Sequence, residues 1–234
     1  MTTGAIIAGG RSTRFGDRDK SVAELAGVPM IRRVADRLAG VDDPVPPGAA
    51  RAAGGDPAVD DLVISCRPDQ RDAIAVALDG LPLPVTWALD EAPDLGPVAG
   101  IRNACRAAAS EYVAVVACDM PFVDPGFLAS LRADAEERDG GVPQLDDGWF
   151  QTTQAVYRAE AMAVACDRAL ANGDRKVVAP LAYLDRVIVG DEAVRSRTTV
   201  RTFTNVNTSE EFAAASAVIA EATGAANEAA GADR

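Results

Sequence analysis

The sequence contains no histidine, only two lysines and few aromatic residues, and these absences narrow its chemistry. Without histidine the chain cannot build a Ser-His-Asp or Cys-His catalytic site, a zinc site with histidine ligands or a histidine-ligated haem. The four cysteines include no Cys-x-x-Cys pair, so they predict buried reduced thiols rather than a zinc site or a disulfide framework. Any reaction must therefore use carboxylates, Lys, Arg, backbone amides or a metal ion bound by oxygen.

Long apolar runs and excess positive charge are also missing. No run of about eighteen apolar residues is present, and the first residues lack the features of a signal peptide, so we expect a cytoplasmic protein without a membrane anchor. The net charge of −12 argues against a nucleic-acid or anionic-membrane surface and favours small-molecule partners. Arginine and aspartate dominate the charged residues, which indicates a halophilic protein; a GC-rich genome explains the arginine but explains the acidic excess less well.

Apolar runs alternate with helix-like segments, and this alternation predicts the fold. Strand-length runs occur at residues 5–8, 62–65, 84–89 and 112–117. Amphipathic segments lie between and after them at residues 30–40, 68–80, 98–109 and 124–138. The pattern predicts one three-layer α/β/α domain with a mainly parallel, Rossmann-like sheet.

Domain boundaries follow from composition. We expect one domain over residues 1–224, with a surface insertion at 42–61, where Pro, Gly, Ala and Asp alternate without a period. A helix beginning at Thr208 should close the domain. Residues 225–234 are predicted to be a disordered tail.

The stretch "AIIAGGRSTRFGDRDK" carries the first functional signal. Gly9 and Gly10 follow a predicted strand and let backbone amides approach an oxyanion, while Arg14 and Lys20 supply charge for phosphates. The stretch is neither a Walker loop nor a dinucleotide fingerprint, because the glycine spacings differ. Gly-Gly alone is more typical of a solvated turn, but with the residues that follow, through Lys20, the stretch predicts a nucleotide-phosphate site.

Four stretches together carry a family resemblance: "AGGRSTRFGDRDK" (8–20), "ALDEAPDLGPVAGI" (88–101), "ACDMPFVDP" (117–125) and "FTNVNTSEEF" (203–212). They resemble, in order, the motifs of nucleotidyltransferases and most closely those of the molybdenum cofactor guanylyltransferases. The first loop is typical of the whole superfamily, whereas the aspartate segment and the Asn-x-Asn-Thr close indicate this family.

The resemblance implies roles on the nucleotide side. It implies that Ile7, Ala8, Gly9 and Gly10 line the nucleotide and that Lys20 binds its phosphates. Asp90 would contact the base or ribose, since a carboxylate can accept from the N1 and N2 donors of guanine. From its position alone, Asp90 is as well explained as a loop or capping residue.

Asp119 is the predicted metal ligand. It follows the run "YVAVVAC", so its carboxylate should project beyond a buried strand, where it would hold Mg²⁺ against triphosphate oxygens. Capping of the next helix is the alternative, but Asp124 before Pro125 already suits that role.

Two departures from the family pattern affect the remaining residues. Cys66 stands where the family commonly has a nucleotide-contacting asparagine, so we assign that contact to Arg67. Thr152 replaces a proline on the acceptor side. The resemblance implies an acceptor site there, and its candidate residues are Gln151, Arg175, Asn205 and Asn207, for which a polar turn or a solvated basic pair remains an equal alternative.

The expected activity is transfer of GMP from GTP to molybdopterin or its molybdenum form, with release of pyrophosphate. In this scheme Lys20, Arg14 and Mg²⁺ on Asp119 are the catalytic groups. The rivals are cytidylyl transfer to the same pterin, guanylyl transfer to a cobalamin precursor, and nucleotide binding without turnover. Other molybdenum cofactor biosynthesis proteins or client enzymes are possible partners.

Overall fold

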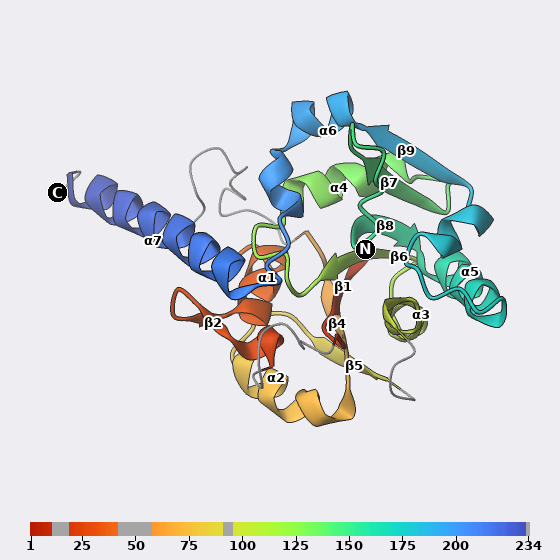
Figure 1. Cartoon of the computed structure of the whole chain (residues 1–234), viewed down its shortest axis with the longest axis horizontal. Helices are drawn as coiled ribbons and strands as arrows, with labels where there is room; N and C mark the ends of the chain where they lie inside the picture. Colours follow the sequence, from red (N-terminus) through yellow and green to blue (C-terminus); the bar gives the residue numbers. More distant parts are fainter. Residues whose placement is uncertain (11–18, 42–57, 91–95, 233–234) are drawn as a thin grey trace.

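A seven-stranded sheet forms the centre of the protein (Figure 1). The computed structural model describes residues 1–10, 19–41, 58–90 and 96–232, with side chains described as far as residue 223. The strand order is β5-β4-β1-β6-β8-β7-β9. These strands are β1 (Thr2–Ile7), β4 (Asp61–Cys66), β5 (Val85–Leu89), β6 (Tyr112–Ala117), β7 (Gly140–Gln144), β8 (Gln154–Arg158) and β9 (Arg186–Gly190).

The strand directions confirm the mainly parallel sheet. β1 pairs in parallel with β4 and β6, and β4 with β5, whereas β8 runs antiparallel to both β6 and β7. The chain adds β4 and β5 on one side of β1 and then returns to place β6 on its other side. The boundary between β1 and β6 is therefore a topological switch point, where loops diverge and leave a crevice at the carboxyl edge.

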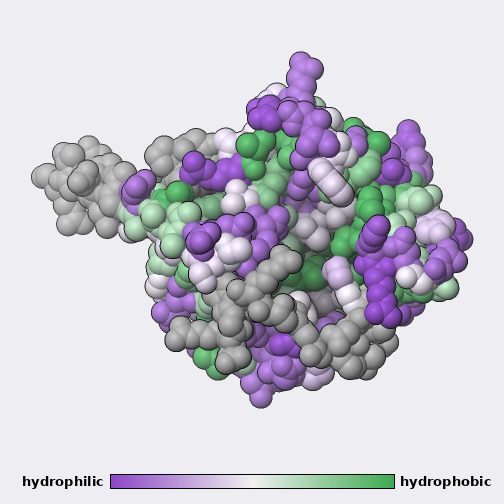
Figure 2. Space-filling view, viewed as in Figure 1, coloured by the Kyte–Doolittle hydropathy of each residue, from purple (hydrophilic) through white to green (hydrophobic). Residues whose placement is uncertain are grey.

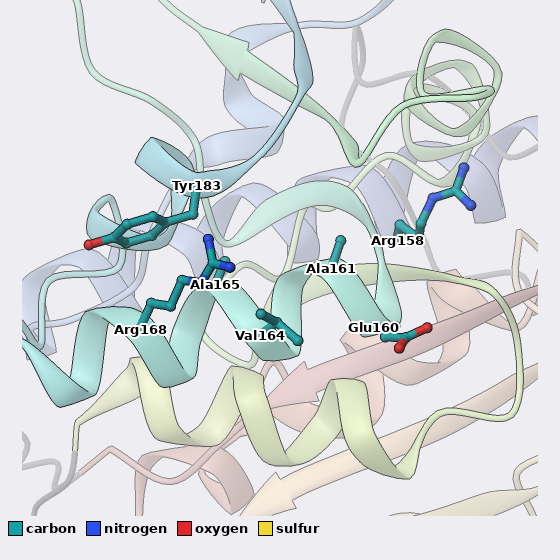
Figure 3. Close-up of a pocket in the computed structure, with 7 residues that line it drawn as sticks. All are labelled: Arg158, Glu160, Ala161, Val164, Ala165, Arg168 and Tyr183. Carbon is teal, nitrogen blue, oxygen red and sulfur yellow. The ribbon is translucent and has the colours of Figure 1, made fainter.

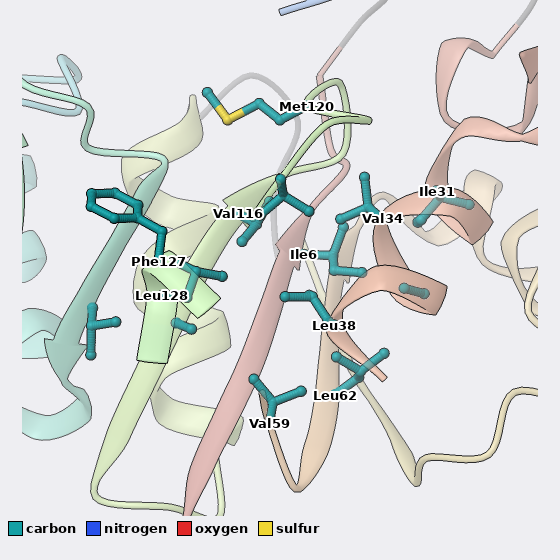
Figure 4. Packing of buried hydrophobic residues seen from close by; sticks show 14 of the residues in the cluster. Ile6, Ile31, Val34, Leu38, Val59, Leu62, Val116, Met120, Phe127 and Leu128 are labelled. Atoms are coloured by element: carbon teal, nitrogen blue, oxygen red, sulfur yellow. The ribbon is translucent and has the colours of Figure 1, made fainter. Parts of the chain in front are cut away.

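Helices cover both faces of the sheet, as the alternation predicts. Helices α1 (Met30–Leu38), α2 (Arg71–Ala77) and α4 (Pro125–Asp134) pack on one face, where Figure 4 shows Ile6 and Val116 facing Val34 and Leu38. Helices α3 (Pro97–Ala107) and α5 (Ala159–Ala171) pack on the other face. Because neighbouring residues along β1, β4 and β6 are buried on opposite faces, the sheet is apolar on both sides.

Smaller elements complete the described structure. They are the hairpin of β2 (Glu24–Leu25) and β3 (Val28–Pro29), helix α6 (Asp191–Arg197), and the 3-10 helices Lys20–Val22, Pro68–Gln70, Ala179–Tyr183 and Val200–Phe203. Helix α7 (Ser209–Ala232) projects from the body at the blue end of the chain (Figure 1). Its first half packs against the domain, where Ala215 and Ile219 join a small cluster with Leu25 and Met30.

Sequence and structure differ most in the second half of the chain. Strand β7 has the sequence GGVPQ, whose glycines and proline argue against a strand, and β9 is a short edge strand; neither is predicted above. Helix α7 runs through most of residues 225–234, where composition predicts a tail, because the alanine-rich sequence favours a helix. The predicted insertion, up to residue 57, lies outside the described residues.

The surface matches the charge of the sequence. Figure 2 shows hydrophilic side chains over much of the visible face, with smaller hydrophobic areas between them. None of the helices that the structure describes is long and apolar enough to cross a membrane.

The glycines of β7 generate a stability prediction. A Cβ on Gly141 would lie 2.7 Å from the backbone oxygen of Leu131 in α4, so Gly141→Ala must push a helix away from the sheet. We expect Gly141→Ala to lower the free energy of unfolding by about 1–3 kcal/mol, measured by urea denaturation. Gly190→Ala, at the end of β9, is the matched control because a Cβ there meets no atom within 4 Å. Equal stability of the two variants would contradict the proposed packing.

Candidate active site at the carboxyl edge of the sheet

Backbone hydrogen bonds beyond the strand ends assemble the site. The amide of Ala8 donates to the Ser65 carbonyl at 2.7 Å, and the amide of Cys118 donates to the Ile7 carbonyl at 3.1 Å. On the far side the amide of Asp90 donates to the Cys66 carbonyl at 3.0 Å. The loops after β1, β4, β5 and β6 therefore leave the sheet in register, at the edge where open α/β sheets bind ligands.

The Lys20 ammonium joins three distant parts of the chain. Its Nζ lies 2.9 Å from Asp119 Oδ2 and 2.8 Å from Asn207 Oδ1. Only 10% of the Lys20 side chain and 19% of the Asp119 side chain are exposed, so this ion pair is largely screened from water. The structure thus brings together the lysine of the first motif, the aspartate of the third and the second asparagine of the fourth.

Asp119 also meets the requirements of a metal ligand. Its Oδ1 atom is buried and has no hydrogen-bond partner among the described residues, while Lys20 contacts Oδ2. The described residues contain no cluster of three His, Cys, Asp or Glu side chains, and Asp119 is the carboxylate that this part of the site offers to a metal ion. This donor set fits Mg²⁺, which keeps water and phosphate oxygens as its other ligands.

Asp90 and the glycine turn are in direct contact. A Cβ on Gly9 would lie 2.6 Å from Asp90 Oδ2, whereas a Cβ on Gly10 would meet no atom within 4 Å. Gly9 is therefore required so that the Asp90 carboxylate can lie against the backbone of the turn. Burial raises the pKa of Asp90, and the charge of Arg67 opposes that increase.

Arg67 forms hydrogen bonds with the backbone of the glycine turn. Its Nη1 donates to the carbonyls of Gly9 at 3.3 Å and Gly10 at 3.0 Å, and its Nε and Nη2 pair with the two oxygens of Asp69. Cys66 is fully buried, and burial together with the nearby Asp90 charge raises the pKa of its thiol to about 12. Cys66 is therefore a neutral core residue, and Arg67 lies against the glycine turn.

The acceptor-side candidates occupy different positions. Asn207 contacts Lys20, whereas the Asn205 amide donates to the Phe203 carbonyl at 3.3 Å. Arg175 is exposed and its Cβ lies near Gly96, directly before α3. Gln151 is half-buried in the loop before β8. Of these four candidates, Asn207 is the one that the described contacts join to the lysine and aspartate.

The remaining candidates lie on the glycine turn or beyond the described part of the chain. Ile7 ends β1 and is half-buried, and Ala8 is buried behind the glycines. Arg14 lies outside the described residues.

Two residues that the sequence reasoning missed contact this site. Gln70, in the 3-10 turn after β4, reaches both Ala8 and Asp19, and Glu211 in α7 binds the backbone beside Asn207. Glutamine in an amphipathic segment gives no sequence signal for such a role. The Thr208-to-Glu211 spacing is the pattern of a capping box, so the sequence is sufficient to identify Glu211 as a helix cap. The sequence gives no sign that this cap lies close to Lys20.

The capping box of α7 is complete. Glu211 Oε2 accepts from the amides of Asn207 at 2.6 Å and Thr208 at 2.9 Å, and Thr208 Oγ1 accepts from the Glu211 amide at 3.1 Å. These bonds fix the backbone that presents Asn207 to Lys20.

A separate groove lies along α5 and contains none of these residues. Arg158, Val164, Arg168 and Tyr183 line it, as Figure 3 shows, with Glu160, Ala161 and Ala165 completing its wall. The Arg168 Cζ atom lies over the Tyr183 ring, 5.8 Å from the ring centroid. The groove therefore offers a mixed surface rather than a convergent set of polar groups.

The fold is an open, mainly parallel α/β sheet, and its switch point carries a lysine, a carboxylate and a glycine turn. Residues 4–187 match the family model of the MobA-like NTP transferase domain. The chain therefore belongs to the MobA-like nucleotidyltransferase family. Its relatives include proteins described as molybdenum cofactor guanylyltransferases.

Individual relatives agree with this assignment. The chain is 42% identical over 210 residues to a probable molybdenum cofactor guanylyltransferase of Natronomonas pharaonis, covering 90% of this chain and 94% of the relative. A protein of the same description from Haloferax mediterranei is 37% identical, with 91% and 92% covered.

Solved structures extend the likeness. The molybdopterin-guanine dinucleotide biosynthesis protein A of Archaeoglobus fulgidus is 25% identical, with a TM-score of 0.71 and with 94% of this chain and 99% of that chain covered. The 4-diphosphocytidyl-2C-methyl-D-erythritol synthase of Anaerococcus prevotii has a TM-score of 0.64 over 92% and 96% of the chains. At 12% identity, it shows the fold alone.

The capping box generates a pH prediction. Hydrogen bonds from the Asn207 and Thr208 amides, together with the Lys20 charge, lower the pKa of Glu211. Because the folded pKa is depressed, this carboxylate stabilises the protein above the ordinary glutamate pKa of about 4.3, and the contribution is lost as pH falls through the lower folded value. We therefore expect Glu211→Ala to lower Tm at pH 7 and to differ less from the wild type at pH 3.

The exposed neighbour provides the control for this experiment. Glu210→Ala changes the same helix turn, but none of the hydrogen bonds that define the capping box uses its side chain. The Tm difference between the Glu210 variant and the wild type should be smaller at pH 7. A Glu211→Ala deficit that stays constant down to pH 3 would contradict the assigned interaction.

Proposed function

We propose that the protein transfers GMP from GTP to the terminal phosphate of molybdopterin, or of its molybdenum form, and releases pyrophosphate. The observation that supports this most strongly is the contact of Lys20 with both Asp119 and Asn207 at the carboxyl edge of the sheet. The arrangement places one cation and one partly unsatisfied carboxylate beside a glycine turn, a combination suited to a nucleoside triphosphate. The relatives described as guanylyltransferases support the choice of reaction.

The reaction requires no histidine. A phosphate monoester has a second pKa near 6, so the terminal phosphate of the acceptor is mostly dianionic at neutral pH and can attack without a general base. A phosphate oxygen of the acceptor forms a bond to the α-phosphorus of GTP while the bond from that phosphorus to the oxygen bridging the α- and β-phosphates breaks. Pyrophosphate leaves with the bonding electrons, so the protein has to align the two phosphates and offset their charge.

The residues of the site divide this work. Lys20 would bind the phosphate chain and offset charge on pyrophosphate, with Arg14 as a second cation, and the Gly9 and Gly10 amides would face the phosphates. Asp119 would hold Mg²⁺ through its unsatisfied Oδ1. When bound, Mg²⁺ supplies charge neutralisation for the triphosphate oxygens.

Base choice is assigned to Asp90. Its carboxylate lies against Gly9 at the turn where Ile7 and Ala8 leave the sheet. A carboxylate accepts from the N1 and N2 donors of guanine, whereas the acceptor-rich edge of cytosine offers no matching pair. Guanine is therefore the expected base, and a preference for CTP would instead support cytidylyl transfer to the same pterin.

The acceptor would bind on the β8 side of Asp119. Asn207 shares the Lys20 ammonium with Asp119, and Asn205, Gln151 and Arg175 would contact other parts of the pterin or its phosphate. The acidic, arginine-rich composition supports a halophilic, cytoplasmic enzyme with small-molecule substrates and no nucleic-acid partner. Other molybdenum cofactor biosynthesis proteins or client enzymes would receive the product.

The metal role is tested with Asp119→Asn. The substitution keeps an oxygen acceptor for Lys20 but removes the negative charge that would hold Mg²⁺, so pyrophosphate release from GTP and molybdopterin should fall at least about a hundredfold. Tm should fall, because the largely buried Lys20 loses its charged partner, but the preserved shape of the side chain should keep the variant folded at the assay temperature. Asp185→Asn removes an exposed carboxylate that pairs with Arg138 and should retain wild-type turnover. Turnover of Asp119→Asn within a few-fold of the wild type would refute the assignment.

Base choice is tested with Asp90→Asn. The substitution turns one acceptor oxygen into an NH₂ group that faces a guanine donor, so GTP binding should weaken by about 1–3 kcal/mol more than CTP binding. Wild-type protein should prefer GTP, and inosine triphosphate, which lacks the N2 donor, should be intermediate. Isothermal titration with the three nucleotides measures the difference, with Asp72→Asn on α2 as the control. Equal losses for GTP and CTP would move Asp90 from the base to the ribose or to a loop role.

A further inference from the structure

Gln70 is a buried amide that touches both described ends of the nucleotide loop. The residue is 2% exposed, and its Nε2 donates to the Ala8 carbonyl at 3.1 Å and to Asp19 Oδ2 at 2.8 Å. Its Oε1 accepts from the Arg67 amide at 3.0 Å. One side chain from the turn after β4 therefore uses both of its donors on residues that are eleven positions apart in the sequence.

Asp19 connects Gln70 to the short helix that begins with Lys20. Asp19 Oδ1 accepts from the amide of Ser21 at 3.0 Å and from its hydroxyl at 2.8 Å, which caps the 3-10 helix Lys20–Val22. Its other oxygen is the one that Gln70 holds. The direction in which this helix begins, and with it the path of the Lys20 side chain toward Asp119, therefore depends on a carboxylate that Gln70 orients.

The same turn holds the glycines from the other side. Arg67 donates to the Gly9 and Gly10 carbonyls, and Gln70 Oε1 anchors the Arg67 backbone. A change at Gln70 would therefore alter the glycine turn and the lysine together.

We propose that Gln70 is a positioning residue that holds the Lys20 ammonium and the Gly9–Gly10 turn in register with each other for phosphate binding. The phosphate role of Lys20 rests on the proposed function, but the positioning itself is a property of the protein without substrate. A carboxylate at this position would face the Asp19 carboxylate and the Ala8 carbonyl, so isosteric Gln70→Glu should disrupt the arrangement by repulsion.

The lysine content of the chain allows a direct test without nucleotide. Lys20 is 8% exposed and Lys176 is exposed, and these are the two lysines of the sequence. A limiting amount of an amine-acylating reagent, followed by peptide mass spectrometry, gives the labelling of Lys20 relative to Lys176. The wild type should show a low ratio, and Gln70→Glu should raise it at least about fivefold.

A reciprocal exchange separates positioning from simple loss of stability. Asp19→Asn alone should also raise the ratio, because its NH₂ group then faces that of Gln70. In the double variant Gln70→Glu/Asp19→Asn, a donor again faces an acceptor, so the ratio should return to within about twofold of the wild type. Ile74→Val, which trims the core under α2, controls for a matched decrease in Tm and should leave the ratio low.

The outcomes distinguish this inference from the proposed function. If the wild type transfers GMP, KM for GTP should rise about tenfold or more in each single variant and recover in the double variant. If the wild type shows no transfer, the labelling ratios still decide the role of Gln70. An unchanged ratio in Gln70→Glu, a double variant no better than the worse single variant, or an equal rise in Ile74→Val would each overturn the inference.

Discussion

The contact of the Lys20 ammonium with Asp119 and Asn207 is the interaction on which the candidate site depends. A charged amine with this little exposure requires partners, since desolvating an unpaired charge is costly. The chain meets that requirement with a carboxylate from the loop after β6 and an amide from the segment before α7. Three segments far apart in the sequence are thereby held at one point.

The parallel sheet makes this convergence possible. Strands β1, β4, β5 and β6 end at one edge, and hydrogen bonds beyond their last residues carry the register into the loops. Each loop contributes residues to the site. The glycine turn follows β1, Arg67 and Gln70 follow β4, Asp90 follows β5 and Asp119 follows β6. The helices on both faces leave this edge open, because they pack against the strands rather than across their ends.

Charge is divided sharply between the surface and the site. The protein carries a net charge of −12, yet the described site holds Lys20 beside Asp119 and Asn207 and places Arg67 against the glycine turn. The acidic exterior suits solubility, whereas the local cations suit a phosphate ligand. The absence of histidine is compatible with this design, since a phosphate nucleophile supplies its own charge and the site has mainly to position and neutralise.

The sequence by itself indicated the elements of the first half of the chain and three residues that the structure brings together, Lys20, Asp119 and Asn207. Periodic apolar runs predicted β1, β4, β5 and β6 because buried parallel strands are nearly continuously hydrophobic, and the Asp124 and Thr208 caps were readable because capping is local. Only the tertiary structure revealed β7, whose glycines are required by close contacts with Leu131 and Val156. It alone also decided which polar residues meet. Gln70 contacts partners 51 and 62 positions away, and Asn207 meets Lys20 across 187 positions, and no local pattern encodes such distances.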